Sequence, residues 1–291
     1  MTETSPSIGD RIKGWLFIAL PHHFLSRIIF KLTRRQGLGV DFSIRKFIAV
    51  FNVDMSDACY LNTRSYHSFN EFFTRSLKPG ARPVDNAENV LVSPVDGTVS
   101  QSGLIEKNQI FQAKDQYYST ESLLGRDYFM AKKFQNGKFA TIYLAPYNYH
   151  RIHMPVQGLL RKMIHVPGRL FSVAQWTVRA IPRLFARNER VICYFETPAG
   201  PVVMVLVGAI NVAAIETVWA GLITPPQAKA ISEYDYSDNT LNYDKGEEMG
   251  RFNMGSTVIL LTGANVQWQE QFTAGNTVRM GELIAQFDLI P

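Results

Sequence analysis

Short runs of β-branched and aromatic residues, bounded by glycine, proline or aspartate, dominate the chain from about residue 88 onward. Such runs are typical of strands joined by tight turns, whereas amphipathic helices would show apolar residues at a period of 3.6. The six clearest runs are Val90–Val92, Thr98–Ser100, Phe139–Leu144, Val191–Phe195, Val202–Val207 and Val258–Leu261. The sequence therefore predicts a mostly antiparallel β domain from about residue 88 to the C-terminus.

Two other segments have a different composition. Residues 47–77 are predicted to be mostly helical or irregular, and the Pro79-Gly80 pair marks a turn after them. Residues 169–190 interrupt the strands with five arginines among apolar and aromatic residues. This arginine-rich segment fits either a lipid-facing or substrate-facing loop, or a surface helix that docks through its aromatic side.

The positive charge of the chain is concentrated near its N-terminus. The formal net charge is +5, yet residues 11–40 carry +6 and residues 1–10 carry −2, so that only +1 remains for residues 41–291. A nucleic-acid groove needs basic residues spread along the fold, so no nucleic-acid partner is predicted.

The basic N-terminal segment contains two short apolar stretches separated by Pro21. Neither reaches the ~20 apolar residues of a membrane span, and no small-residue cleavage site of a signal peptide is present. A helix here would place four apolar residues on one side and most bases on the other, namely Leu25, Ile28, Ile29 and Leu32. The pattern fits a helix lying on a membrane surface or one packed on the protein's own core.

The two cysteines, Cys59 and Cys193, are too far apart for a zinc ribbon or a redox CxxC motif. Their small number also excludes a disulfide-rich scaffold, so we expect a reducing compartment.

Three segments have the density of polar and turn residues expected of a reaction site. Aspartate, histidine and serine can form a nucleophilic triad, which is defined by geometry and not by order along the chain. The segments are residues 93–97 with Asp96, residues 143–155 with His150 and His153, and residues 245–261 with Gly255 and Ser256.

The chemistry of these segments leaves more than one possibility. Two histidines and Asp96 could ligate a metal, but HExxH is absent and no cysteine is near, so proton transfer is favoured and no metal is predicted. Because Gly255 has no side chain, nothing would obstruct attack of the Ser256 hydroxyl on the preceding carbonyl. The GxSxG motif of α/β-hydrolases is absent around Ser256.

Together these segments resemble the bacterial phosphatidylserine decarboxylases, pyruvoyl-dependent enzymes of phospholipid synthesis. The resemblance runs from about Phe69 to the C-terminus, and its motifs occur in the family's order. They are Phe69–Arg75, Ser93–Gly97, Tyr149–Pro155, Gly168–Val173 and Lys245–Gly250 followed by Gly255-Ser256-Thr257. This chain has Met254 where the family usually has leucine, and Asn148 where members often have an acid.

The resemblance implies an inactive proenzyme that cleaves itself. Asp96 would orient His153, which removes the proton from Ser256 so that its oxygen attacks the Gly255 carbonyl. Elimination from the resulting ester would release a beta subunit, residues 1–255, and leave a dehydroalanine at position 256. This group would tautomerise and lose ammonia on hydrolysis, so that the alpha subunit, residues 256–291, begins with a covalent pyruvoyl group derived from Ser256.

The resemblance also implies the reaction and its setting. The pyruvoyl ketone would form a Schiff base with the amine of phosphatidylserine and accept the electron pair left behind when the carboxylate departs as CO2. Protonation and hydrolysis would then release phosphatidylethanolamine. His150 would donate a proton or position the carboxylate. Residues 1–40 would be membrane-associating helices on an anionic surface, at the cytoplasmic face of the cell membrane, and residues 41–291 the catalytic domain. The two fragments would form a heterodimer, with further oligomerisation left open.

The implied fold is α+β, with a β-rich core of two facing, barrel-like sheets preceded by amphipathic helices. Two other functions remain open at this point. One is a non-catalytic membrane-docking module with a lipoyl-like barrel, which would not cleave itself. The other is a Ser-His-Asp lipid hydrolase, which would act as an intact chain.

Overall fold

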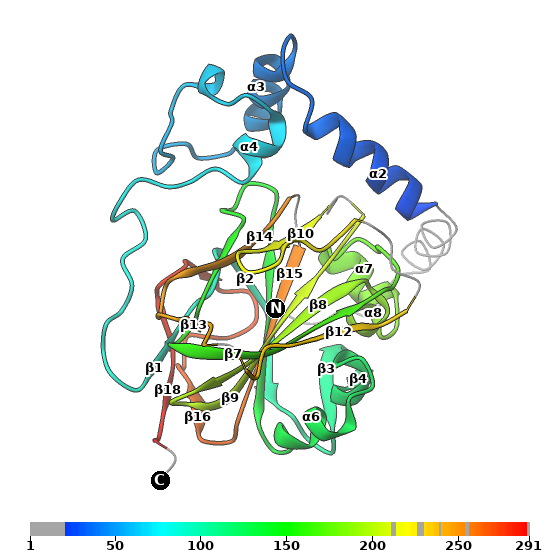
Figure 1. Cartoon of the computed structure of the whole chain (residues 1–291), viewed down its shortest axis with the longest axis vertical. Helices are drawn as coiled ribbons and strands as arrows, with labels where there is room; N and C mark the ends of the chain where they lie inside the picture. Colours follow the sequence, from blue (N-terminus) through cyan, green and yellow to red (C-terminus); the bar gives the residue numbers. More distant parts are fainter. Residues whose placement is uncertain (1–20, 211–213, 226–229, 239, 254–255, 290–291) are drawn as a thin grey trace.

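A computed structural model describes residues 21–210, 214–225, 230–238, 240–253 and 256–289 (Figure 1). Predictions for residues 1–20, Met254 and Gly255 lie outside these described residues. The described part combines short helices with several antiparallel sheets, which confirms the α+β class. Its sheets are open and do not close into barrels.

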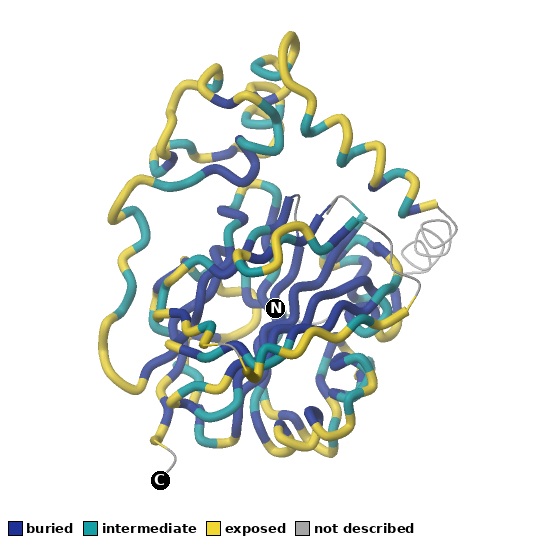
Figure 2. Tube along the Cα trace, viewed as in Figure 1, coloured by how far each residue is buried: buried dark blue, intermediate teal, exposed yellow. Residues whose placement is uncertain are grey.

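The centre of the molecule is a nine-stranded antiparallel sheet. Its spatial order is β12 (Ser232–Asp235), β7 (Gly158–Val166), β8 (Arg190–Thr197), β9 (Gly200–Val207), β15 (Ser256–Thr262), β5 (Lys138–Leu144), β2 (Gly97–Leu104) and β17 (Thr277–Val278), with β13 (Asn242–Tyr243) also beside β7. All seven residues of β15 are buried, as expected for a continuous apolar run covered on both faces. Figure 2 shows this buried centre in dark blue.

Smaller sheets complete the β-rich core. A three-stranded sheet has the order β1 (Val90–Val92), β18 (Leu283–Phe287) and β16 (Val266–Trp268), and a four-stranded sheet has the order β11 (Gly221–Leu222), β10 (Ile215–Thr217), β14 (Glu248–Phe252) and β6 (Arg151–His153). The hairpin of β3 (Gln109–Ala113) and β4 (Gln116–Ser119) forms a two-stranded sheet of its own. Each of the six predicted strands is confirmed, as part of β1, β2, β5, β8, β9 or β15.

Helices α2 (His22–Thr33), α3 (Val40–Phe51) and α4 (Phe69–Phe73), with the short η1 (Thr63–Ser65), lie at one end of the molecule (Figure 1). Helices α3 and α4, with the residues between them, form a separate small core that includes Ile44, Phe72 and Phe73. The Ser68 hydroxyl begins α4 by accepting a hydrogen bond from the Glu71 amide. The prediction that residues 47–77 are mostly helical or irregular is confirmed, since short helices alternate there with irregular segments.

Helix α2 buries its apolar side only in part, since Leu25 and Ile29 are half-buried. Phe24, Ile28 and Leu32 are 61%, 40% and 53% exposed, and the buried residues of the helix are His22 and Ser26. Near its first turn, His23 Nε2 lies 2.9 Å from the Gly168 carbonyl oxygen. Among the described residues no helix is long and apolar enough to cross a bilayer.

The remaining helices are short and border the sheet. They are α5 (Thr120–Leu123), α6 (Tyr128–Lys133), α7 (Gln175–Ala180) and α8 (Leu184–Arg187). The last two occupy the arginine-rich segment, and the side chains of Leu184 and Phe185 are buried. Of the two structures considered for this segment, docked surface helices are the one observed.

Candidate functional site

The three polar segments of the sequence meet at one end of the central sheet. Strand β6, which ends at His153, pairs with β14, so that His153 lies opposite Glu248. The amide of His153 also donates to the Pro94 carbonyl (2.9 Å), which joins this strand to the turn before Asp96. Because Pro94 and Glu248 both contact the backbone of His153, this pairing brings together residues that are more than 150 positions apart in the chain.

Asp96 is buried at the start of β2, and its carboxylate is fully engaged. Arg82 donates to both oxygens, with its closest contact, Nη2 to Oδ2, at 2.6 Å, and the Met280 amide donates at 2.8 Å. Arg82 also pairs with Asp57 at 2.7 Å. The two carboxylates raise the pKa of Arg82, which fixes a permanent positive charge beside Asp96.

His153 is held at both ring nitrogens. Its Nδ1 lies 2.8 Å from the Gly246 carbonyl oxygen, an acceptor only, so Nδ1 carries the proton. Its Nε2 then accepts from the Tyr149 hydroxyl at 3.1 Å. Gly246 has a φ of +82°, a left-handed turn that suits glycine. Burial lowers the pKa of His153, so the ring is a neutral base at neutral pH.

Ser256 is the first residue of β15 and is completely buried. It lies opposite Leu144, the last residue of β5, and its hydroxyl has no hydrogen-bond partner among the described residues. An unpaired buried hydroxyl costs free energy of folding, and the hydroxyls of Thr257 and Thr141 share this state, so the missing partner leaves Ser256 available for chemistry without by itself singling it out.

His150 lies in a different environment from His153. It is completely buried and stacks on Phe73, with ring centroids 4.1 Å apart. Burial, together with the smaller effect of the Arg75 charge, lowers the pKa of His150 to about 3. Nearby backbone carbonyls oppose the shift only in part, and neither ring nitrogen has a well-aligned partner among the described residues. His150 is therefore neutral at physiological pH.

Asn148 replaces the acid that often precedes the first histidine of the motif. Its side-chain oxygen accepts a hydrogen bond from the Ala145 backbone amide at 2.8 Å, and its backbone amide donates to the Ala145 carbonyl. The residue thus closes a turn between β5 and β6, and its amide cannot supply a negative charge to His150.

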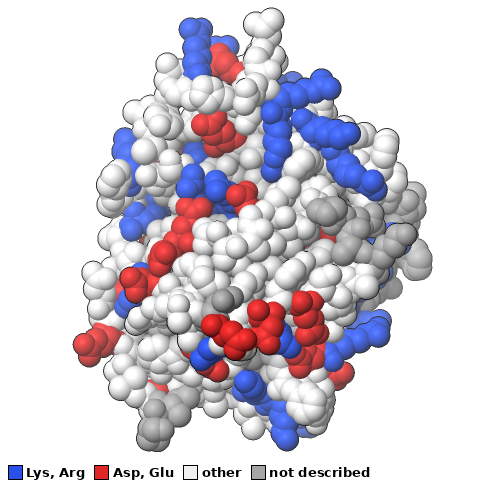
Figure 3. All heavy atoms as spheres, in the orientation of Figure 1, with Lys and Arg blue, Asp and Glu red and all other residues white. Residues whose placement is uncertain are grey.

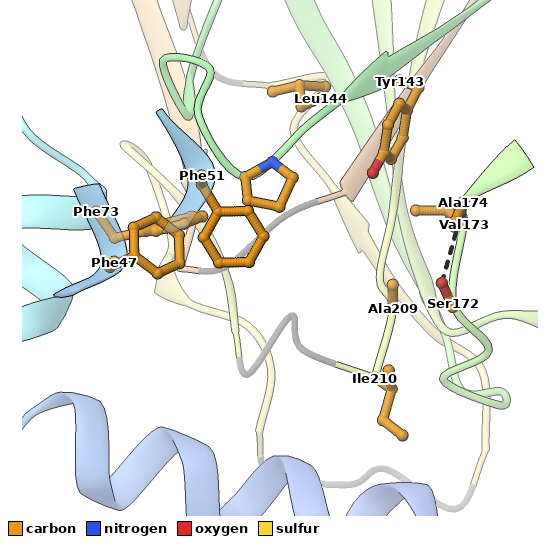
Figure 4. A pocket seen from close by; sticks show the side chains of 11 residues that line it. Phe47, Phe51, Phe73, Tyr143, Leu144, Ser172, Val173, Ala174, Ala209 and Ile210 are labelled. Carbon is orange, nitrogen blue, oxygen red and sulfur yellow. Dashed lines mark hydrogen bonds between the residues drawn. The ribbon is translucent and has the colours of Figure 1, made fainter. Parts of the chain in front are cut away.

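An apolar cavity of about 100 Å³ opens beside the Ser256 end of β15. Figure 4 shows Phe47 and Phe51 from α3 and Phe73 from α4 on one side, and Tyr143 and Leu144 from β5 opposite them. The segment with Ser172, Val173 and Ala174 also lines the cavity. Because Leu144 is the strand partner of Ser256, the cavity offers an apolar approach to that residue.

The predicted residues are gathered but do not form a hydrogen-bonded triad. No hydrogen bond joins Ser256 to His153 or His153 to Asp96 in the described part of the chain. The Asp96 charge still acts on His153, where it favours the protonated ring. Within the described ranges no group of three His, Cys, Asp or Glu residues is arranged to hold a metal ion.

Sequence reasoning missed the residues that hold the histidines and the aspartate. Tyr149 lies in the same motif as the two histidines, so its position could have marked it as a residue of the site. Arg82 is 14 residues from its carboxylate partner and carries no motif. Arg75 ends the Phe69–Arg75 motif, is buried, and has an Nε without a partner among the described residues.

Comparisons with known proteins agree with the motifs. Residues 69–286 match the family model described as phosphatidylserine decarboxylase. A phosphatidylserine decarboxylase proenzyme of Alkalilimnicola ehrlichii is 53% identical over 262 residues, which cover 89% of this chain and 91% of the relative. A proenzyme of the same name from Shewanella putrefaciens is 49% identical over 285 residues, covering 96% and 99% of the two chains.

Proposed function

The chain belongs to the phosphatidylserine decarboxylase family, and from that premise we propose which of its residues carry out each stage of its chemistry. Membership of this family shows which reaction the protein catalyses. The protein is a carboxy-lyase of phospholipid biosynthesis that is made as a proenzyme, acquires a covalent pyruvoyl group and converts phosphatidylserine to phosphatidylethanolamine and CO2.

In the first stage, Ser256 is the nucleophile and His153 the general base. The Ser256 oxygen attacks the carbonyl carbon of Gly255, a residue outside the described part, while His153 Nε2 takes the hydroxyl proton. Because Tyr149 donates to that nitrogen, its hydroxyl must first turn away. The peptide bond becomes an ester, and elimination then separates residues 1–255 from residues 256–291.

In this scheme Asp96 acts on the base through space. The Gly246 carbonyl and the charge of Glu248 favour the imidazolium that forms on His153, and the charge of Asp96 adds a smaller contribution. Arg82 and the Met280 amide keep the Asp96 carboxylate in place. The Gly246 carbonyl, in direct contact with Nδ1, sets the tautomer. The single observation that carries the proposal is the buried Ser256 hydroxyl, which has no partner among the described residues, at the end of the sheet where the segments of Asp96 and His153 meet.

The surroundings of Ser256 fit a pyruvoyl group at that position. The residue lies at the end of an apolar strand next to an apolar cavity, where a carbonyl is shielded from bulk water. The bound group supplies an electron sink for the pair left by the departing carboxylate. The low pKa of His150 supports the positioning role, because a neutral ring donates an N–H to the carboxylate without carrying charge.

We also propose that the enzyme binds the cytoplasmic face of the cell membrane through its N-terminal helices. On α2, exposed Phe24, Ile28 and Leu32 alternate with the exposed bases Arg27 and Lys31. Figure 3 shows Lys and Arg side chains gathered over α2. A two-tailed substrate requires such contact, and each basic residue near an anionic leaflet contributes about 1 kcal/mol.

An intact mass spectrum tests the maturation scheme. We expect the wild-type protein to give fragments 1–255 and 256–291, the second with an N-terminal pyruvoyl group. Ser256→Ala should give one species near 32.9 kDa with no decarboxylase activity. Thr141→Val, which removes a buried hydroxyl from the neighbouring strand, is the control and should be cleaved. Fragments from Ser256→Ala would refute Ser256 as the nucleophile. An uncut wild-type chain that hydrolyses lipid esters would favour the hydrolase alternative.

Vesicle sedimentation tests the membrane proposal. Arg27→Glu with Lys31→Glu should reduce binding to phosphatidylglycerol-containing vesicles, and more at low salt than at high salt because salt screens exposed charges. Lys107→Glu with Lys114→Glu makes the same charge change at exposed positions outside α2 and should bind nearly as well as the wild type. Equal loss in both double variants would show that only net charge matters.

A further inference from the structure

A second cavity of the molecule, whose lining residues belong to none of the three polar segments, is strongly basic. It has a volume of about 480 Å³ and lies between α5, α8 and the end of β7. Four arginines line it, namely Arg126, Arg183, Arg187 and Arg190. No carboxylate is among its described lining residues. We call this cavity the arginine pocket.

The positive charge of the arginine pocket is not neutralised by the protein. None of the four arginines lies within 4.0 Å of a carboxylate in the described part of the chain. Burial lowers the pKa of Arg187, and the charges of Arg183 and Arg169 lower it further. Like charges held together without counterions favour binding of an anion.

Two of the four guanidinium groups are fixed by the fold. Arg190 is buried, and four of its five N–H groups donate to backbone carbonyls: Nε to Leu123 at 2.7 Å, Nη2 to Ser122 at 2.6 Å, and Nη1 to Ala186 and Asn188 at 3.0 and 2.9 Å. It therefore contributes a fixed positive charge and one remaining N–H. Arg187 lies over the ring of Phe171, 4.9 Å from its centroid. They form a preorganised floor, which lowers the entropy cost of binding.

The other two guanidinium groups come from exposed residues in an unusual backbone conformation. Arg126 and Arg183 have φ values of +71° and +54°, the left-handed region that non-glycine residues seldom adopt. Backbone preference therefore does not explain why arginine occupies these two positions. Arginine donors in a fork suit the oxygens of a phosphate group.

The arginine pocket lies close to the docking point of α2. Phe171, which contacts Arg187, also packs edge-on against His22, with ring centroids 5.6 Å apart. His23 contacts Gly168, the residue after the lining residue Pro167. The pocket is thus adjacent to the first turn of the helix that we place on the membrane.

We propose that the arginine pocket binds the phosphate group of an anion at a site distinct from the Ser256 site. The phosphate can belong to the headgroup of an anionic phospholipid or to a soluble phosphate compound. Arg126 and Arg183 close on its oxygens above the fixed Arg187 and Arg190. The site does not depend on the proposed maturation chemistry, because none of its lining residues belongs to the three polar segments.

Two assays with the purified full-length protein distinguish the two sources. Calorimetric titration with inorganic phosphate at constant ionic strength tests soluble phosphate, and flotation with phosphatidylcholine vesicles, with and without phosphatidylglycerol, tests the headgroup. The test variant is Arg126→Asn with Arg183→Asn, because asparagine tolerates positive φ. The control is Lys107→Asn with Lys114→Asn, which removes two exposed charges, one of them also at positive φ.

We expect the test variant to bind about tenfold more weakly than the wild type and the control, as loss of charge-assisted hydrogen bonds predicts. A difference in the titration identifies soluble phosphate as the ligand, and a difference only with phosphatidylglycerol vesicles identifies a lipid headgroup. Equal binding of all three proteins in both assays overturns the proposal. If the double variant does not fold, the same comparison with Arg183→Asn alone decides the outcome.

Discussion

His150 and His153 are three residues apart, yet the fold gives them different chemical properties. His153 has a partner at each ring nitrogen, so its tautomer and orientation are fixed. His150 is stacked on Phe73 and has no well-aligned partner among the described residues. The first arrangement suits a base that must point in one direction, and the second suits a neutral ring that meets a ligand entering from the cavity.

The low pKa of His150 makes stability depend on pH. Below pH 6.5 the unfolded chain protonates this histidine while the folded chain does not until about pH 3, so the free energy of unfolding should fall as the pH drops through this window. The slope from this residue is at most about 1.4 kcal/mol per pH unit. Urea unfolding of uncut Ser256→Ala between pH 7 and pH 4 measures it.

Adding His150→Gln to that variant should make the slope smaller, because one titrating group is gone while His153, whose pKa burial also lowers, remains. Adding His67→Gln, which removes an exposed histidine, should leave the slope unchanged. An identical slope with and without His150 would show that its ring is not shielded from protons.

Strands β2 and β5 approach closely where the site begins. A Cβ added to Gly97 would lie 2.6 Å from the backbone oxygen of Tyr143, a distance that only movement of the strands could relieve. At Gly103, on the same strand, the nearest atom would be a Phe139 ring carbon at 3.5 Å, which is ordinary contact. Glycine is therefore required at the first position and dispensable at the second.

We expect Gly97→Ala to separate the two strands, displace the adjacent Asp96 and reduce both thermal stability and self-cleavage. Gly103→Ala should be cleaved like the wild type, with a midpoint of unfolding within a few degrees of it. Thermal unfolding and intact mass measured on both variants check this expectation. Normal cleavage of Gly97→Ala would mean that the position of Asp96 does not govern maturation.

The elements that the sequence predicted well are those with a local signal. Apolar β-rich runs between turn residues marked β1, β2, β5, β8, β9 and β15. The arrangement of those strands could not be predicted, because the order of a sheet depends on pairing between distant segments. The same limit applies to the site. Motifs located Asp96, His153 and Ser256, whereas the contacts of Arg82, Tyr149 and the Gly246 carbonyl exist only after folding.

For the whole molecule, the position of β15 determines how the two fragments relate after cleavage. This strand lies between β9 and β5, with backbone pairs along both edges. Residues 256–291 also contribute β16, β17 and β18 to two different sheets. The short fragment is thus interleaved with the long one and is not attached to its surface.

We therefore expect residues 1–255 and 256–291 to remain together after cleavage. Size-exclusion chromatography of the mature protein in native buffer should give one peak that contains both fragments, because extraction of β15 would expose a fully apolar strand and break two rows of hydrogen bonds. The fragments should separate only in denaturant. Loss of the short fragment in native buffer would contradict the described sheet order.

The burial of Ser256 within a central strand also makes activation a test of folding quality. The serine obtains its neighbours only when β15 has inserted between β5 and β9, so a misfolded chain has no means to cut itself. In the proposed scheme, every molecule that carries the reactive ketone therefore has a correctly assembled centre, because a chain whose β15 is not inserted cannot form that group.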